Sequence, residues 1–261
     1  LEDSDGDGSF ETKKVFGDGV NLASGIEVGF GGVWIGAAPE LLFYPDANRD
    51  DVPDAEPTVL LDGWGYQDTH ETLNSFTWGM DGWLYGCHGV FTHSNVGKPG
   101  TAKEDRTPLN AGVWRYHPVR HEFEVYAHGT SNPWGVDFNQ NGDWFVSACV
   151  IPHLFHLSQG GRYSRQAGQH FNPYTYDDIK TIADHLHYGD GTFQSANSAN
   201  RVDRDLVRRT AATTSMVGGG HAHAGLTIYQ ADEFPAHYRG ELFFHNLHGH
   251  RIVREHLETE G

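Results

Sequence analysis

The sequence predicts an all-β fold, a β-propeller of four-stranded antiparallel blades, and a recurring strand–turn–strand pattern is the main observation behind this prediction. The clearest copy spans residues 75–89, where an apolar run leads into the turn Met80-Asp81-Gly82 and Trp83-Leu84-Tyr85 resumes an extended run rich in strand formers. An Asp-Gly pair supplies the positive φ of a tight hairpin turn. Weaker copies cover residues 26–36, 134–146 and 226–244. Repetition at intervals of roughly 45–90 residues is typical of propeller blades.

Length and composition agree with this fold class. The chain of 261 residues suits one large domain, residues 1–261, and its 33 glycines and 13% aromatic residues suit short strands joined by turns. Residues 160–218 are the least propeller-like and are interpreted as an insertion, with a short helix over residues 176–187. We expect about four to six blades, because the repeats account for about four. The alternatives are a truncated propeller and a smaller ring that the N-terminal strand closes against residues 226–258.

The formal net charge of −17 argues against nucleic acid and anionic membranes as partners, so a small molecule is the expected one. No run approaches the roughly 18 apolar residues of a membrane span, and no signal peptide is recognisable. The sequence leaves the oligomeric state open. Two cysteines, Cys87 and Cys149, do not make a disulfide framework and are expected to be buried thiols. Each follows a core-type strand of a neighbouring repeat, so the two can lie close together.

Two short acidic loops predict calcium sites. Carboxylates at alternate positions, followed by a glycine that permits a sharp turn, let one loop wrap a hard cation with oxygen ligands. The second loop resembles the calcium loops of thrombospondin-type repeats, although Asp51 stands where glycine is usual. Either site would pin the outer hairpin of a blade, and the alternative is a solvated acidic turn. The predicted ligands are Asp3, Asp5, Asp7 and Glu11 in the first loop and Asp46, Asn48, Asp50 and Asp54 in the second.

Segments that cross the top of a blade are expected to line the central funnel of the propeller. Residues 65–74 follow an outer strand at 58–61 and lead into the central hairpin, so they should pass beside the axis. Residues 128–135 enter the next blade in the same way. The alternative is a crossover loop that hydrogen-bonds to itself. The polar candidates in these two segments are Asp68, His70, Glu71, Asn74 and Asn132.

The 18 histidines are more than ordinary usage explains. His221 and His223 follow three glycines and alternate along an extended segment, so they face the same way, as two metal ligands or an acid–base pair would. Further histidines stand near the ends of strands and are expected to converge with them. Zn²⁺ is an alternative to Ca²⁺ at such a cluster because imidazole is a good zinc ligand and a poor calcium ligand. Packing roles for single histidines are the other interpretation. The remaining members are His88, His153, His245 and His248.

These motifs, in this order, resemble the propellers of soluble quinoprotein aldose and sorbosone dehydrogenases, and those of large bacterial proteins described as membrane-bound dehydrogenases. The matching segments are residues 75–86, 131–135 and 234–243. The resemblance implies a propeller fold, pyrroloquinoline quinone as cofactor, and a periplasmic or secreted location. Ser131 stands in place of the family's quinone-binding Arg, and His70 lies about one residue from the position of the family's catalytic His.

Three functions follow from these features. The first is a calcium- or metal-dependent hydrolase of a lactone or sugar-derived ester, by analogy with propeller lactonases. An axial cation would polarise the carbonyl and a histidine would activate water. The second is quinone-dependent sugar oxidation, in which His70 abstracts the hydroxyl proton, and the third is a non-enzymatic, calcium-stabilised binding propeller. The scarcity of basic residues near the axis favours the hydrolase over the dehydrogenase. Its cation ligands would be Glu71, Asn74 and Asn132, and its base His70, His221 or His223.

Overall fold

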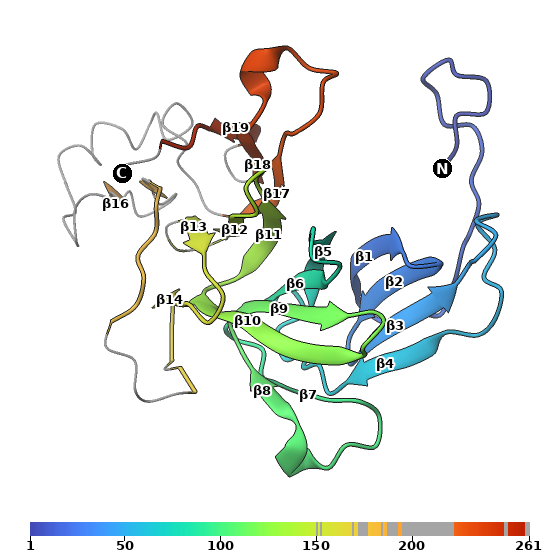
Figure 1. Ribbon diagram of the computed structural model, residues 1–261, viewed down its shortest axis with the longest axis horizontal. Helices are drawn as coiled ribbons and strands as arrows, with labels where there is room; N and C mark the ends of the chain where they lie inside the picture. Colours follow the sequence, from blue (N-terminus) through green and yellow to red (C-terminus); the bar gives the residue numbers. More distant parts are fainter. Residues whose placement is uncertain are drawn as a thin grey trace.

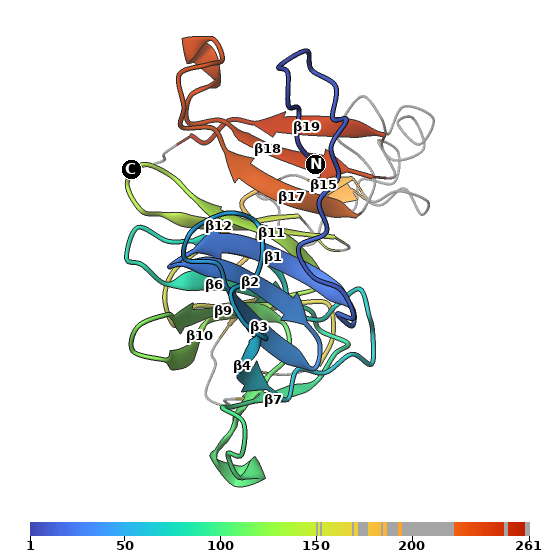
Figure 2. The ribbon, with the colours of Figure 1, turned by 90° about the vertical axis from the view of Figure 1, so that its right-hand side faces the viewer.

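The computed structural model describes residues 1–149, 151, 153–168, 170–171, 177–183, 185–186, 193–194, 222–247 and 250–258. In these residues the chain is nearly all β-structure, and its main sheets follow one another around an arc (Figures 1 and 2). The described strands form an incomplete propeller-like fold, which confirms the predicted fold class. No helix among them has both the length and the apolar composition that crossing a bilayer requires.

Four sheets correspond to blades. The first has the order β1 (Ala23–Gly29), β2 (Gly32–Ala37), β3 (Glu40–Pro45) and β4 (Thr58–Asp62). The second has the order β14 (Arg162–Arg165), β10 (Glu122–Thr130), β9 (Gly112–His117), β6 (Leu84–His88) and β5 (Asn74–Trp78). The third contains β11 (Pro133–Phe138), β12 (Trp144–Ala148) and β13 (Leu154–Leu157), and the fourth β17 (His223–Ile228), β18 (Leu242–Asn246) and β19 (Arg251–Glu255).

Short elements complete the described structure. They are the strand pairs β7 (Ser94–Val96) with β8 (Thr107–Leu109) and β15 (His185–Leu186) with β16 (Phe193–Gln194), and the 3₁₀ turns η1 (Lys103–Asp105) and η3 (Ala236–Tyr238).

The repeated hairpin is the inner half of every blade. Each predicted copy forms an antiparallel pair, namely β1 with β2, β5 with β6, β11 with β12 and β17 with β18. The first strand of each pair is the innermost, because β1 contacts β5, β5 contacts β11 and β11 contacts β17. The turns use the expected chemistry: φ is +51° at Phe30, +81° at Gly31, +77° at Gly82 and +83° at Gly142. Local turn chemistry therefore sets the register that brings these four strands together.

Aromatic side chains fill the space between neighbouring sheets. Trp114 is fully buried between the first and second sheets, and a Cβ at Gly86 would lie 2.3 Å from its ring, so only glycine fits there. Between the second and third sheets, Tyr85 stacks on Trp144 with ring centroids 3.8 Å apart. Tight packing of this kind fixes the sheets relative to one another and so positions the ends of their inner strands.

The helix predicted over residues 176–187 is wrong for the part of that range that the structure describes. The backbone N–H of Ile179 donates to the carbonyl of Arg162 at 2.9 Å, and its carbonyl accepts from Ser164 at 3.0 Å, so the segment is extended. Further along, His185–Leu186 forms β15. The side chains of Ile179 and Ile182 are 46% and 43% exposed, so their helical spacing does not build a buried face. The backbone at Ile179 hydrogen-bonds to the edge of β14 instead of forming a helix, and the spacing of apolar residues does not predict this pairing.

Candidate functional site

Two adjoining cavities lie where the innermost strands of the four sheets meet. One, of about 560 Å³, is lined by residues 22–26, Ile35, Thr69, His70 and Trp134. The other, of about 400 Å³, shares residues 24–26 and Trp134 and is completed by Ser75, Phe76, Ala224, Gly225 and His245. We call these two cavities the axial groove. Each of the four sheets contributes residues to its wall.

Each innermost strand has an irregular pairing near its beginning, at the groove. The register shifts lie between Ala23 and Gly25 in β1, Asn74 and Thr77 in β5, Pro133 and Val136 in β11, and Ala224 and Thr227 in β17. A bulge bends its strand and re-aims the side chains around it, and bulges are frequent at the rims of barrels and beside active sites. In the same region Ser75 has φ +56°, a strained conformation for a residue with a side chain. All four innermost strands therefore share one irregularity at the same end of the fold.

His70 stands at one end of the groove beside a carboxylate. Its side chain is 86% exposed, and its Nδ1 lies 3.6 Å from Oδ1 of Asp68. The same carboxylate oxygen accepts a hydrogen bond from the backbone N–H of His70 at 3.0 Å. The indole N–H of Trp134 donates to the carbonyl oxygen of His70 at 2.6 Å. An exposed imidazole beside a carboxylate at the edge of a cavity is a candidate general base.

Glu71, next in the chain, points into the protein instead. It is 3% exposed, and its carboxylate accepts a hydrogen bond from the backbone N–H of Phe91. Burial raises the pKa of Glu71 to about 7, against the opposing effect of the Phe91 N–H and with a further increase from the charge of Asp68. A Cβ at Gly89 would lie 2.4 Å from the Cβ of Glu71, so the two segments are in close contact. Glu71 therefore joins the crossover segment to the loop after β6.

Asn74 and Asn132 do not line the groove either. Asn74 is fully buried, and its amide donates to the carbonyl of Thr72 at 2.9 Å while its Oδ1 accepts from the Ser75 hydroxyl at 2.8 Å. The backbone carbonyl of Asn132 accepts from the N–H of Cys149 at 2.9 Å, and its buried Oδ1 has no hydrogen-bond partner among the described residues. The oxygen ligands that a hydrolytic axial cation requires are thus withdrawn from the cavity.

His88 is a core residue of the second sheet. Its Nδ1 lies 2.9 Å from the carbonyl of Gly89 and its Nε2 lies 2.7 Å from the Ser94 hydroxyl, so both ring nitrogens have partners. Burial lowers the pKa of His88 to about 4, which keeps the ring neutral near pH 7. The two cysteines are buried thiols, as predicted, and burial raises the pKa of Cys87 and of Cys149 to about 12.

The other predicted histidines are brought together only in part. The rings of His153 and His223 stack with centroids 4.2 Å apart, and both are buried against Phe244. His245 is exposed and lines the groove. His221 and His248 lie outside the described residues. The pair of stacked rings contributes packing between the third and fourth sheets, whereas His245 is the member that faces a cavity.

The first acidic loop has the geometry of a cation site. Ligand oxygens of Asp3, Asp5, Asp7 and Glu11 all lie within 4.8 Å of one another, and among the described residues no other set of three or more acidic, histidine or cysteine groups does so. Backbone N–H groups, chiefly that of Gly8, lower the pKa of Asp3, and the N–H of Ser4 lowers that of Glu11. These hydrogen bonds favour the ionised forms of Asp3 and Glu11.

The second acidic loop is closed by its own backbone. The carboxylate of Asp46 accepts from the N–H groups of Asp50 and Asp51, both at 3.2 Å, and Oδ2 of Asp54 accepts from the N–H of Ala47 at 2.7 Å. Asn48 donates to Oδ2 of Asp50 at 3.0 Å. These oxygens accept hydrogen bonds from the loop's own N–H groups, and they do not form a cluster like that of the first loop.

Most residues that line the groove were missing from the predicted site residues, and Trp134 and Ser24 illustrate why. Trp134 was assigned to a strand, although its position directly after Ser131-Asn132-Pro133 at a crossing between blades is the signal that points to the groove. Ser24 belongs to the first strand, and its hydroxyl donates to the carbonyl of Leu73 at 2.6 Å. No local sequence pattern identifies Ser24, because its place depends on how the sheets meet.

Comparisons with solved structures identify proteins of similar architecture. The chain is similar to an oxidoreductase described as a glucose dehydrogenase from Thermus thermophilus, with 15% identity, a TM-score of 0.40, and coverage of 95% of this chain and 82% of the other. It is also similar to the pyrroloquinoline quinone-bound form of aldose sugar dehydrogenase from Streptomyces coelicolor, with 13% identity, a TM-score of 0.39, and coverage of 94% and 80%. No curated protein matches the chain.

These comparisons and the site geometry correct the predicted activity. The lactonase-type hydrolase prediction is not borne out, because its cation ligands Glu71, Asn74 and Asn132 do not line the groove. Neither similar structure is described as a hydrolase. A family model described as a domain of unknown function, DUF7133, matches residues 1–261. The chain therefore belongs to the DUF7133 family.

Proposed function

We propose that this domain binds a small polyhydroxylated molecule of the sugar class in the axial groove, as the substrate-binding part of a sugar-dehydrogenase-type oxidoreductase. The observation that carries the proposal is Trp134, which borders both cavities of the groove between His70 at one end and His245 at the other. An aromatic face flanked by a few polar groups is the usual arrangement for a ligand with apolar C–H faces and many hydroxyl groups. The sequence resemblance to sugar dehydrogenases agrees with this ligand class.

The groove also offers a group for the first chemical event of such an oxidation. Oxidation of an alcohol removes the hydroxyl proton together with a hydride equivalent from the carbon. His70, with Asp68 beside it at 3.6 Å, is the candidate acceptor of the proton. The hydride equivalent would pass to an external two-electron acceptor such as a quinone.

The described residues do not fit a resident pyrroloquinoline quinone. A tricarboxylate needs several cationic partners, and the described lining of the groove includes neither lysine nor arginine. Ser131, in the position of the family's arginine, is fully buried and its hydroxyl donates to Gln166. No step is therefore assigned to that cofactor. The same observation favours a second candidate function, a binding propeller that recognises a sugar without oxidising it.

The first acidic loop supports a separate proposal, a structural Ca²⁺ held by Asp3, Asp5, Asp7 and Glu11. Oxygen-only ligands within 4.8 Å of one another suit this ion. The loop belongs to the N-terminal segment, which projects away from the sheets in Figure 1, so we assign the ion no part in chemistry at the groove.

Calorimetric titration with a panel of aldoses, together with dye reduction in the presence of added quinone, tests the function. Binding of one aldose that Trp134→Ala and His70→Gln weaken supports the groove as the site. Dye reduction that depends on the sugar and fails in His70→Gln supports oxidation, whereas binding without reduction selects the binding propeller. Failure of every aldose to bind overturns both.

A further inference from the structure

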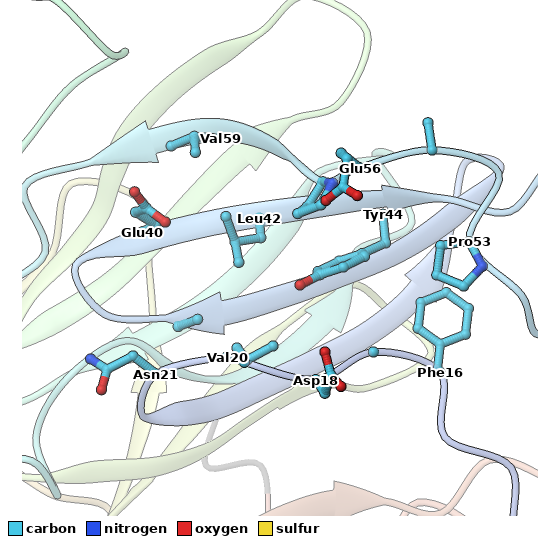
Figure 3. A pocket seen from close by; sticks show the side chains of 15 residues that line it. Phe16, Asp18, Val20, Asn21, Glu40, Leu42, Tyr44, Pro53, Glu56 and Val59 are labelled. Carbon is cyan, nitrogen blue, oxygen red and sulfur yellow. The ribbon is translucent and has the colours of Figure 1, made fainter.

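A third cavity, of about 550 Å³, lies on the first sheet, apart from the axial groove. Its floor is the sheet face formed by β2, β3 and β4, and its walls are the segments 16–21 and 53–57 (Figure 3). None of the residues around it belongs to the candidate sugar site. The N-terminal segment contacts this face of the sheet through Phe16, whose ring packs edge-on against Tyr44 with ring centroids 6.0 Å apart. The cavity remains open beside this contact.

The floor is apolar for a reason that the strand register makes plain. Side chains alternate along β3, so Glu40, Leu42 and Tyr44 share one face of the sheet. Their partners across the ladder include Ala37 on β2 and Val59 on β4, which line the same cavity. The result is a patch of aliphatic and aromatic surface with a carboxylate at one end.

The hydroxyl of Tyr44 gives this cavity a polar group that the protein does not use. Tyr44 is only 7% exposed, yet its hydroxyl has no hydrogen-bond partner among the described residues. Figure 3 shows the hydroxyl near the middle of the labelled side chains. The hydroxyl oxygen itself remains accessible from the cavity, so a ligand that enters there can form a hydrogen bond with it.

The charges around this hydroxyl have one sign. Figure 3 shows Asp18 and Glu56 on either side of the hydroxyl and Glu40 beyond Leu42, and the lining includes no lysine, arginine or histidine. The nearby Lys14 is engaged elsewhere, because its Nζ donates to the carbonyl of Asp50 and lies 3.9 Å from Asp51. A cationic ligand would be attracted to such a cavity, and an anionic one repelled.

We propose that this cavity is a binding site for a small organic cation, a protonated amine with an apolar body. The ammonium group would lie beside Asp18 and Glu56 and donate to the Tyr44 hydroxyl, while Glu40 adds negative charge at the far end of the cavity. The apolar body of the ligand would rest on Leu42, Val59 and the Phe16 ring. The rings of Tyr44 and Phe16 also favour a cation through their π-faces. The site is independent of the proposed sugar function.

Titration calorimetry with benzylamine at pH 7 tests this site, with benzyl alcohol as the neutral probe of the same shape. Benzylamine is expected to bind at least about tenfold more tightly than benzyl alcohol. Its affinity is expected to fall as salt is added. Tyr44→Phe should weaken its binding about two- to tenfold, the range for one lost hydrogen bond. Asp18→Asn and Glu40→Gln should each weaken it about two- to fivefold. Glu104→Gln, which removes an exposed carboxylate of η1, is the matched control and should leave the affinity unchanged.

Equal affinity for the amine and the alcohol would overturn the proposal, as would amine binding that Tyr44→Phe, Asp18→Asn and Glu40→Gln leave intact. Thermal melting of each variant identifies those that have lost the fold. Asp18 is exposed and distant from the buried core, so Asp18→Asn keeps the test decisive if the Tyr44 variant does not fold.

Discussion

The indole N–H of Trp134 donates to the backbone carbonyl of His70 at 2.6 Å, and this bond joins two segments that are remote in the sequence. Trp134 is the second residue of β11, the inner strand of the third sheet, whereas His70 lies in the crossover segment that leads into the second sheet. Both residues border the same cavity. The bond therefore fixes the aromatic wall of the groove and the backbone of its candidate base at the same time.

Trp134→Phe keeps an aromatic ring and removes this hydrogen bond. We expect the free energy of unfolding to fall by about 1 kcal/mol, the net contribution of one such bond. Sugar binding is expected to weaken about two- to tenfold, because the position of His70 is no longer fixed. Urea denaturation and calorimetric titration measure the two effects.

The matched control is Trp78→Phe, which removes an indole hydrogen bond of the same kind, from Trp78 to the carbonyl of Val28 at 3.0 Å, outside the groove. It should cost similar stability and leave sugar affinity unchanged. If both variants lower sugar affinity equally, the effect reflects general destabilisation and the special role of Trp134 is lost.

Local sequence patterns predicted the inner hairpins correctly because their causes are local. Asp81-Gly82 and Asn141-Gly142 supply the positive φ of a turn, and apolar alternation on either side defines two strands. The funnel also follows from this pattern, since identical hairpins begin at the same end of each sheet. Neither inference needs contacts between distant residues.

The candidate site residues were harder to predict because burial is a property of the assembled sheets. Glu71 and His88 have the same polar character as His70, yet the loop at residues 89–91 covers Glu71 and the Ser94 hydroxyl binds His88 in the core. The strand bulges depend on how the four sheets meet, as does the place of Ser24. The helix expected over residues 176–187 failed for a similar reason, the edge of β14.

Glu71→Gln should change how stability depends on pH. The folded-state pKa of about 7 lies above the ordinary value of 4.5, so the folded protein holds this proton more tightly than the unfolded chain. The contribution of protonated Glu71 to the free energy of unfolding is complete below about pH 4.5. It is lost as the pH rises through about 7, and the loss is at most about 3 kcal/mol. The Gln side chain does not ionise and still accepts from Phe91, so the variant should exceed the wild type in stability at pH 8 but not at pH 4. Urea denaturation at both values measures this, with the exposed Glu104→Gln as control. A difference that is the same at the two pH values would contradict the buried, protonated Glu71.

Calcium is expected to bind the first acidic loop. Asp5→Asn combined with Asp7→Asn should weaken Ca²⁺ binding by at least about tenfold, because the loop loses two of its four carboxylates. Calorimetric titration of chelator-treated protein measures the affinity. Asp50→Asn, in the second loop, is the control and is expected to have little effect on this site. Loss of binding in the control alone would assign the ion to the second loop instead.

His88→Gln should reveal a pH dependence of opposite sign to that of Glu71. The folded-state pKa of about 4 lies below the ordinary 6.5, so the unfolded chain binds the proton more readily. The wild type therefore keeps the full contribution of neutral His88 above about pH 6.5 and loses it as the pH falls towards about 4.

At pH 7.5 the variant should be less stable by about 1–3 kcal/mol, because the Ser94 hydroxyl loses its partner. At pH 5 that gap should shrink by about 2 kcal/mol, since the variant has no imidazole to protonate. His245→Gln, at an exposed position, is the control variant for the loss of a histidine. If the difference in stability between the wild type and His88→Gln is the same at both pH values, the lowered pKa of His88 in the folded chain is contradicted. Its contacts with Gly89 and Ser94 in the core would then have to be weaker than described.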